Sequence, residues 1–143
     1  MTQDSASKKA LPIGIQTFRE IREENYYYVD KTALAIKLIR EGKHYFLSRP
    51  RRFGKSLFLD TLKELFEGHQ PLFKGLAAEY QWDWSLKYPV LHFSFGGNNY
   101  NQLGHAECDL QEQLSKLEKQ YQLIPDSTSC AGRFKSLILH LKA

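Results

Sequence analysis

The stretch His44-Tyr-Phe-Leu-Ser-Arg-Pro-Arg-Arg-Phe-Gly-Lys-Ser-Leu57 is the most informative part of this chain. Residues 45–47 are a short apolar run typical of a buried strand, and residues 54–66 are apolar on nearly all sides, which predicts a well-covered helix. The loop between them, residues 48–53, runs into Gly54-Lys55-Ser56. A strand, a loop with this ending and a helix are the setting that a phosphate-binding loop requires.

The Gly-Lys-Ser triplet suits phosphate chemistry. The N-terminus of a helix offers backbone N–H groups without partners and the positive end of the helix dipole. Gly54 lets the backbone approach the phosphates, Lys55 can reach the β- and γ-phosphates, and the Ser56 hydroxyl can ligate Mg²⁺. We therefore expect ATP and Mg²⁺ as ligands, with Ser56 as the magnesium ligand. The expected binding residues are Pro50, Arg51, Arg52, Phe53, Gly54, Lys55, Ser56 and Leu57.

Two features of the loop leave other interpretations open. The pattern G-x-x-x-x-G-K-[ST] begins with glycine, whereas Arg49 stands at that position, and Pro50 removes one backbone donor. The arginines and Lys55 could be a solvated basic turn, or they could contact a nucleic-acid backbone. The net charge of +4, from 20 basic and 16 acidic side chains, does not distinguish nucleotide from nucleic acid.

Composition limits the class of protein. A chain of 143 residues with 42% hydrophobic and 25% charged residues is one compact domain at most. Residues 1–10 are expected to be a disordered tail, and residues 11–143 the domain. The sequence has no apolar run near the ~20 residues of a membrane span and no secretory signal, so we expect a cytoplasmic protein with no membrane partner.

Hydrophobic periodicity predicts the other elements. Residues 26–29 and 89–95 are predicted to be short strands, and Asp30 is expected to cap a helix over residues 31–41. Residues 103–121 have the clearest amphipathic pattern, which predicts a helix with Asp109, Glu112 and Glu118 on its water-facing side. A last helix is expected to follow a cap at Ser127 or Ser129.

Four stretches together resemble the predicted AAA-ATPase-like family of bacterial proteins. They are Leu11-Pro-Ile-Gly-Ile, Tyr27-Tyr-Val-Asp-Lys-Thr32, Arg49-Pro-Arg-Arg-Phe-Gly-Lys-Ser56 and Tyr88-Pro-Val-Leu91. The family also lacks the first glycine of the loop. The resemblance implies an α/β fold, namely the three-layer α/β/α architecture of P-loop NTPases. Members often carry a nuclease domain similar to restriction endonucleases, through which nucleic acid would be a partner.

Members of the family continue into a Walker B strand that ends in acidic residues. Such a carboxylate holds Mg²⁺ and helps position the attacking water. No candidate strand after the loop of this chain ends in an acid, so we expect the N-terminal part of a P-loop domain, truncated before its Walker B strand. We expect this part of a P-loop domain to bind ATP. The sequence does not decide whether it is an enzyme that hydrolyses ATP. The missing strands would leave Leu59, Leu62 or Phe66 exposed. The alternatives are an inactive truncated gene product and a basic fragment that binds phosphate or nucleic acid.

Overall fold

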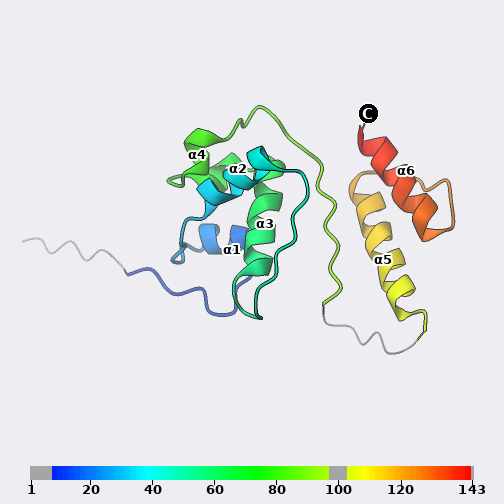
Figure 1. Ribbon diagram of the computed structural model, residues 1–143, viewed down its shortest axis with the longest axis horizontal. Coiled ribbons are helices and arrows are strands. Elements are labelled where there is room, and N and C mark those ends of the chain that lie inside the picture. Colours follow the sequence, from blue (N-terminus) through cyan, green and yellow to red (C-terminus); the bar gives the residue numbers. More distant parts are fainter. Residues whose placement is uncertain (1–7, 97–102, 143) are drawn as a thin grey trace, which may run out of the picture. The chain divides into compact units, whose positions relative to one another are not determined.

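The computed structural model describes residues 8–96 and 103–142, and helices are the regular secondary structure of these residues (Figure 1). The elements in chain order are α1 (Phe18–Glu23), α2 (Thr32–Glu41), α3 (Lys55–Phe66), the 3-10 helix η1 (Gln70–Phe73), α4 (Ala78–Gln81), α5 (His105–Gln120) and α6 (Cys130–Lys142). The chain divides into two compact units, unit 1 (residues 1–90) and unit 2 (residues 91–143). Most of the predicted tail, residues 1–10, lies outside the described residues. None of the described helices is long and apolar enough to cross a membrane.

The predicted α/β fold, with a three-layer α/β/α architecture cut off before a Walker B strand, is wrong. No residue within 8–96 or 103–142 belongs to a β-strand. Residues 45–47 are extended but exposed, and the side chain of Phe46 is 93% accessible to water. A short apolar run becomes a strand only when a second strand completes its hydrogen-bond ladder, and no described segment does so here.

The alternating pattern of residues 89–95 is satisfied without a sheet. In unit 2, Leu91 and Phe93 pack against the buried side chains of α5 and α6. The side-chain amide of Gln113 makes the hydrogen bonds to Ser94 that a neighbouring strand would make in a sheet. Its Oε1 accepts the backbone N–H of Ser94 and its Nε2 donates to the backbone carbonyl of the same residue, both at 2.8 Å. The pattern therefore predicted the half-buried face correctly but not the element that covers it.

Unit 1 has an aromatic core. Phe18 of α1 and Phe73 of η1 are fully buried, with ring centroids 4.8 Å apart. Leu65 of α3 and Ile36 of α2 complete the same cluster, and Trp84 packs on its edge. Helices α1 and α3 lie side by side in this unit (Figure 1). Helix α3 is therefore packed against α1, α2, η1 and α4 through Leu65, and Leu57 of its first turn packs against the same cluster.

The predicted helices are confirmed, with small changes at their ends. The expected helices over residues 31–41, 54–66 and 103–121 are α2, α3 and α5. Helix α5 begins at His105 because Gly104 has the left-handed φ of 91° and stands outside the helix. Helix α6 follows Ser129, whose hydroxyl accepts the backbone N–H of Gly132 at 3.1 Å. Of the two expected caps, Ser129 therefore satisfies a free N–H group of the first turn.

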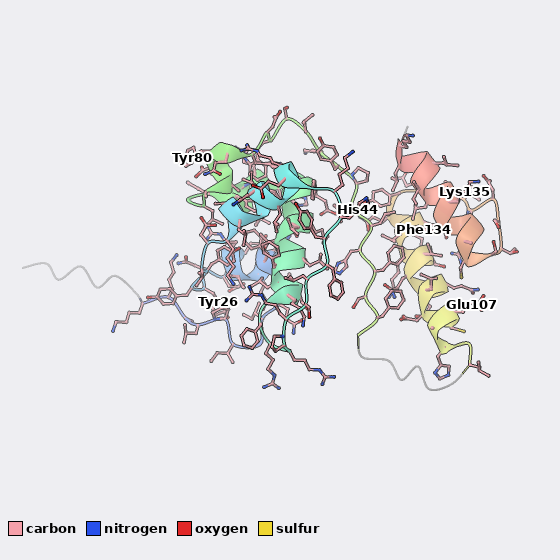
Figure 2. The ribbon with its side chains drawn as sticks, viewed as in Figure 1. Tyr26, His44, Tyr80, Glu107, Phe134 and Lys135 are labelled. Carbon is pink, nitrogen blue, oxygen red and sulfur yellow. The ribbon has the colours of Figure 1, made fainter. Side chains whose placement is uncertain are left out.

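Helices α5 and α6 pack side by side in unit 2 (Figure 1). Leu114 and Leu137 are fully buried between them, and Phe134, labelled in Figure 2, stacks edge-on against Phe93 with centroids 5.6 Å apart. Glu118 was expected to face water but is only 4% exposed. It is buried because Arg133 of α6 donates to both of its carboxylate oxygens, which compensates the charge.

Candidate phosphate-binding loop

The loop that leads into α3, residues 48–54, is called the basic loop below. Two of its residues have left-handed backbone conformations, Arg52 with φ 65° and Gly54 with φ 75°. Residues other than glycine adopt this region at a cost, so Gly54 suits the last turn before the helix. A Cβ atom added at Gly54 would meet no other atom within 4 Å, so the space over this backbone is open.

Lys55 lies back over the basic loop. Its ammonium group donates to the backbone carbonyl of Arg49 and to that of Pro50, the latter at 3.2 Å. The side chain thereby spans the loop from its last turn to its first residues. The ammonium group of Lys55 is thus held at the first carbonyl groups of the loop.

The first turn of α3 presents backbone donors at the same place. The first hydrogen bond within the helix is donated by the N–H of Phe58 to the carbonyl of Gly54, at 2.9 Å. The N–H groups of Lys55, Ser56 and Leu57 therefore have no partner inside the helix. Together with the Lys55 ammonium group and the exposed Ser56 side chain, they form a set of donors at the positive end of the helix dipole.

The other predicted site residues fall into two groups. Arg51, Arg52 and Phe53 are exposed, and the side chain of Phe53 is 60% accessible to water. Leu57, by contrast, is half-buried and packs against the core of unit 1. Leu57 can contribute only its backbone N–H to a ligand, because its side chain is engaged in packing.

The first two acidic residues after the loop are committed to holding α1. The carboxylate of Asp60 accepts the backbone N–H of Phe18 at 2.7 Å, which caps the start of α1. The carboxylate of Glu64 accepts a hydrogen bond from Arg19 at 2.9 Å and is 4% exposed. Neither carboxylate is placed to serve a ligand at the N-terminus of α3.

Glu64 also belongs to a cluster at the other end of α3. Its Oε2 lies 2.5 Å from Nδ1 of His69, and one carboxylate oxygen of Glu67 lies 3.7 Å from the same nitrogen. These three side chains offer ligand atoms within 4.8 Å of one another, a spacing that a metal ion could use. Because Arg19 already neutralises Glu64, we interpret the cluster as an ion-pair network that joins α1 to the end of α3.

Asp30 and Thr32 join the starts of α2 and α4. One oxygen of Asp30 accepts the N–H and the hydroxyl of Thr32, at 2.8 and 2.6 Å, and the other accepts the N–H of Ala77 at 2.8 Å. The Thr32 hydroxyl oxygen in turn accepts the N–H of Ala78 at 3.0 Å. Burial raises the pKa of the Asp30 carboxyl, but these hydrogen bonds outweigh it and leave the pKa below its ordinary value. Lys31 occupies the N-cap position of α2, but Asp30 accepts the first helical N–H as predicted, and it also anchors α4.

A cavity of about 280 Å³, called the flanking cavity below, adjoins the basic loop. Its lining includes Leu11, Pro12, Tyr27 and Val29 from the chain before α2, and Gly54 and Phe58 from the loop and α3. Sequence reasoning did not assign the first four of these residues to the site. The available signal was a Pro-Ile-Gly turn at residues 12–14 and, further along the chain, three consecutive tyrosines at residues 26–28.

A second, larger hollow of about 740 Å³ follows the exposed side of α3. Leu62 and Phe66 line it, together with Phe46 from the extended segment. Leu59 is 49% exposed in the same wall. The expectation that this side of α3 lacks cover is therefore confirmed at Leu59, whereas Leu62 and Phe66 are half-buried.

Comparison with known proteins bears on the whole chain. A family model described as "Predicted AAA-ATPase" matches residues 12–143. A protein of Azotobacter chroococcum mcd 1, described as an uncharacterized protein in the vnfD 5' region, is 53% identical over 133 residues. That alignment covers 92% of this chain and 26% of the relative, so the chain spans about a quarter of the length of the curated relative it matches. No solved structure matches the chain.

Proposed function

Because the chain belongs to the predicted AAA-ATPase family, we propose that its basic loop binds the phosphates of a nucleoside triphosphate, ATP in the first place. The observation that carries the proposal is the position of Lys55. Its ammonium group is folded over the loop and lies at the N-terminus of α3, where three backbone N–H groups lack helical partners. An anion there would find charge and directed donors already in place.

The residues present fit a triphosphate with its magnesium ion. Gly54 leaves open space over the backbone, so a phosphate can approach without meeting a side chain. Ser56 is exposed in the first turn of α3, where its hydroxyl would supply one oxygen ligand to Mg²⁺. When bound, the ion would neutralise charge on the phosphates. The roles of the chain are to bind and orient the phosphates through Lys55 and the N–H groups.

We propose binding without efficient hydrolysis by the described part of the chain. Hydrolysis needs a carboxylate that holds Mg²⁺ or orients the attacking water. Asp60 and Glu64, the first carboxylates after the loop, are engaged by Phe18 and Arg19 of α1. We expect phosphate release from ATP to stay at the rate of a control without protein, as measured by a coupled phosphate assay.

In the binding experiment, the full chain is titrated with ATP and Mg²⁺ in an isothermal titration calorimeter. Lys55→Ala should weaken binding at least tenfold, because the ammonium group that hydrogen-bonds across the loop is removed. Lys37→Ala is the matched control, since Lys37 is an exposed lysine of α2. Equal affinity of Lys55→Ala and the unmodified chain would overturn the proposal.

The competing interpretation, a basic fragment that binds nucleic acid, gives a different result. The exposed Arg49, Arg51 and Arg52 would then contact a phosphate backbone. Binding of a single-stranded oligonucleotide would fall steeply with salt and would not respond to ATP. Our proposal expects ATP to bind. It would be contradicted by a chain that binds the oligonucleotide but does not bind ATP.

A further inference from the structure

The flanking cavity lies where the rest of a bound nucleotide would have to go. Gly54 belongs both to the basic loop and to the lining of this cavity. A ligand whose phosphates meet the N-terminus of α3 at Gly54 would therefore lie next to this cavity. The segments around Pro12 and Tyr27 also line the cavity.

The walls of the flanking cavity are apolar, and its rim is left uncovered. Leu11 is 67% exposed and Val29 is 76% exposed, although both are large apolar side chains. Tyr27, which is 50% exposed, adds an aromatic ring to the same rim. Apolar and aromatic side chains around a small hollow favour a flat, weakly polar ligand that buries its faces against them.

Polar groups are present at the inner part of the cavity. Tyr28 and Thr61 both belong to its lining, and the Tyr28 side chain hydrogen-bonds with Thr61 and with the backbone of Lys31. Burial raises the pKa of the Tyr28 phenol, with those hydrogen bonds opposing the rise, so the phenol stays protonated at neutral pH. The lining of the cavity thus includes hydroxyl groups as well as apolar surface.

The cavity is preformed by backbone contacts. The N–H of Tyr27 donates to the carbonyl of Ala10 at 3.0 Å, which holds the two N-terminal segments together. The N–H of Ile15 donates to the carbonyl of Pro12 at 3.4 Å across a turn, with Gly14 at the left-handed φ of 76°. Asp60 of α3 caps α1 directly after this turn. The turn, α1 and α3 are therefore linked, and binding would not need to order the cavity first.

The size of the cavity restricts the ligand. About 280 Å³ is just below the ~300–1,000 Å³ of pockets that enclose a drug-sized molecule. It suits one heteroaromatic ring system rather than a whole nucleotide. The sugar and phosphates would then lie outside, toward Gly54 and Lys55.

We propose that the flanking cavity is the base subsite, in which the nucleobase, adenine in ATP, stacks against Tyr27 and is enclosed by Leu11, Pro12 and Val29. The position of the phosphates rests on the proposed function. The cavity itself does not depend on it, and the two can be tested with separate probes.

The experiment compares ATP with Mg²⁺, inorganic tripolyphosphate and adenosine on the full chain by calorimetry and by NMR shift titration. Tyr27→Ala should weaken the binding of ATP roughly tenfold, as expected for the loss of one stacking partner. It should leave the affinity for tripolyphosphate unchanged. Lys55→Ala should have the opposite pattern, with tripolyphosphate lost and adenosine unchanged. Tyr80→Ala is the matched control, because Tyr80 is 85% exposed on α4, at the end of unit 1 opposite to the basic loop (Figures 1 and 2).

Each outcome separates the base subsite from the phosphate site. Adenosine binding that is lost in Tyr27→Ala supports the subsite, even if tripolyphosphate does not bind and the proposed function fails. Tripolyphosphate binding as tight as that of ATP, with no response to adenosine, overturns the subsite and leaves the phosphate site standing. No binding of any probe overturns both. Leu11→Asp is a second variant that places a carboxylate at the rim and should weaken adenosine without disturbing the core.

Discussion

The carboxylate of Asp30 accepts the backbone N–H of Ala77 at 2.8 Å, across 47 residues of sequence. With its other oxygen it accepts the N–H of Thr32 at the start of α2. One side chain thus fixes the beginnings of α2 and α4. This explains locally why the Asp30-Lys-Thr32 stretch has its particular residues, since Thr32 extends the same network to Ala78.

Replacing Asp30 with alanine should lower the free energy of unfolding of unit 1 by about 1–3 kcal/mol, because a helix cap and a tertiary acceptor are lost together. Urea unfolding followed by tryptophan fluorescence measures this change, since both tryptophans, Trp82 and Trp84, lie in unit 1. Asp126→Ala, an exposed aspartate in unit 2, is the control. An Asp30→Ala chain as stable as the control would contradict the role of the network.

The same carboxylate predicts a dependence of stability on pH. The pKa of Asp30 is below its ordinary value in the folded chain, so the charged form stabilises the fold above the unfolded pKa of about 3.9. That contribution is lost as the pH falls through the lower, folded pKa. Between about pH 5 and pH 2, the free energy of unfolding should fall less in Asp30→Asn than in the unmodified chain, because the asparagine side chain does not titrate. Parallel profiles for the two chains would argue against it.

Gly54→Ala tests the backbone of the basic loop. The added Cβ meets no atom within 4 Å, so the cost comes from the left-handed φ of 75° alone. We expect a loss of roughly 1 kcal/mol in the free energy of unfolding. The control is Gly96→Ala, which also has open space and no left-handed φ, and which should change stability little. A neutral Gly54→Ala would mean that the loop relaxes to another conformation.

The exposure of the Phe46 side chain can be tested by its effect on stability. Phe46 is 93% exposed, so Phe46→Ser should change the free energy of unfolding by less than about 0.5 kcal/mol. Leu65→Ala, at a fully buried position of α3, should cost about 2–5 kcal/mol in the same assay. A cost for Phe46→Ser close to that of Leu65→Ala would show that the 45–47 segment is packed in solution.

Unit 2 depends on the pair between Glu118 and Arg133. The side chains are 6% and 12% exposed, and Arg133 also donates to the Ser115 hydroxyl at 2.8 Å. Arg133→Met leaves Glu118 buried without its charge partner, so unit 2 should lose about 3–5 kcal/mol of stability. Helix content followed by circular dichroism in urea reports this loss.

A double-mutant cycle isolates the pair. Glu118→Gln combined with Arg133→Met should cost less than the sum of the two single changes, with a coupling of about 0.5–3 kcal/mol. Lys116 is exposed on α5, the helix that carries Glu118. Lys116→Met combined with Arg133→Met should therefore give additive losses of stability, and this pair is the control. Additive effects of Glu118→Gln and Arg133→Met would show that the two side chains act independently.

The helices could be predicted from the sequence because their signals are local. Apolar spacing, Asp30 before α2, Gly54 before α3 and Ser129 before α6 all act within a few residues. The strands could not be predicted in the same way. Alternation in residues 89–95 indicates only that one face is covered, and helices α5 and α6 cover it here. Whether an extended segment joins a sheet depends on a second segment that its own residues do not specify.

The candidate site was predictable only where it is continuous in sequence. Gly54, Lys55 and Ser56 carry the chemistry of one loop, so their pattern was sufficient to propose phosphate as the ligand. The flanking cavity joins residues near position 11 to others near positions 27 and 54, and folding alone brings them together. The burial of Glu118 was missed for the same reason, since Arg133 approaches from another helix.

The hydrogen bonds of Lys55 affect the thermodynamics of any anion that enters the basic loop. The ammonium group already has the Arg49 and Pro50 carbonyls as acceptors, so an arriving phosphate exchanges one set of partners for another. The number of hydrogen bonds changes little in such an exchange, whereas a neutral acceptor is replaced by a charged one. Because a hydrogen bond to a charged acceptor is stronger than one to a neutral carbonyl, affinity should rise with the number of negative charges on the ligand, from monophosphate to triphosphate.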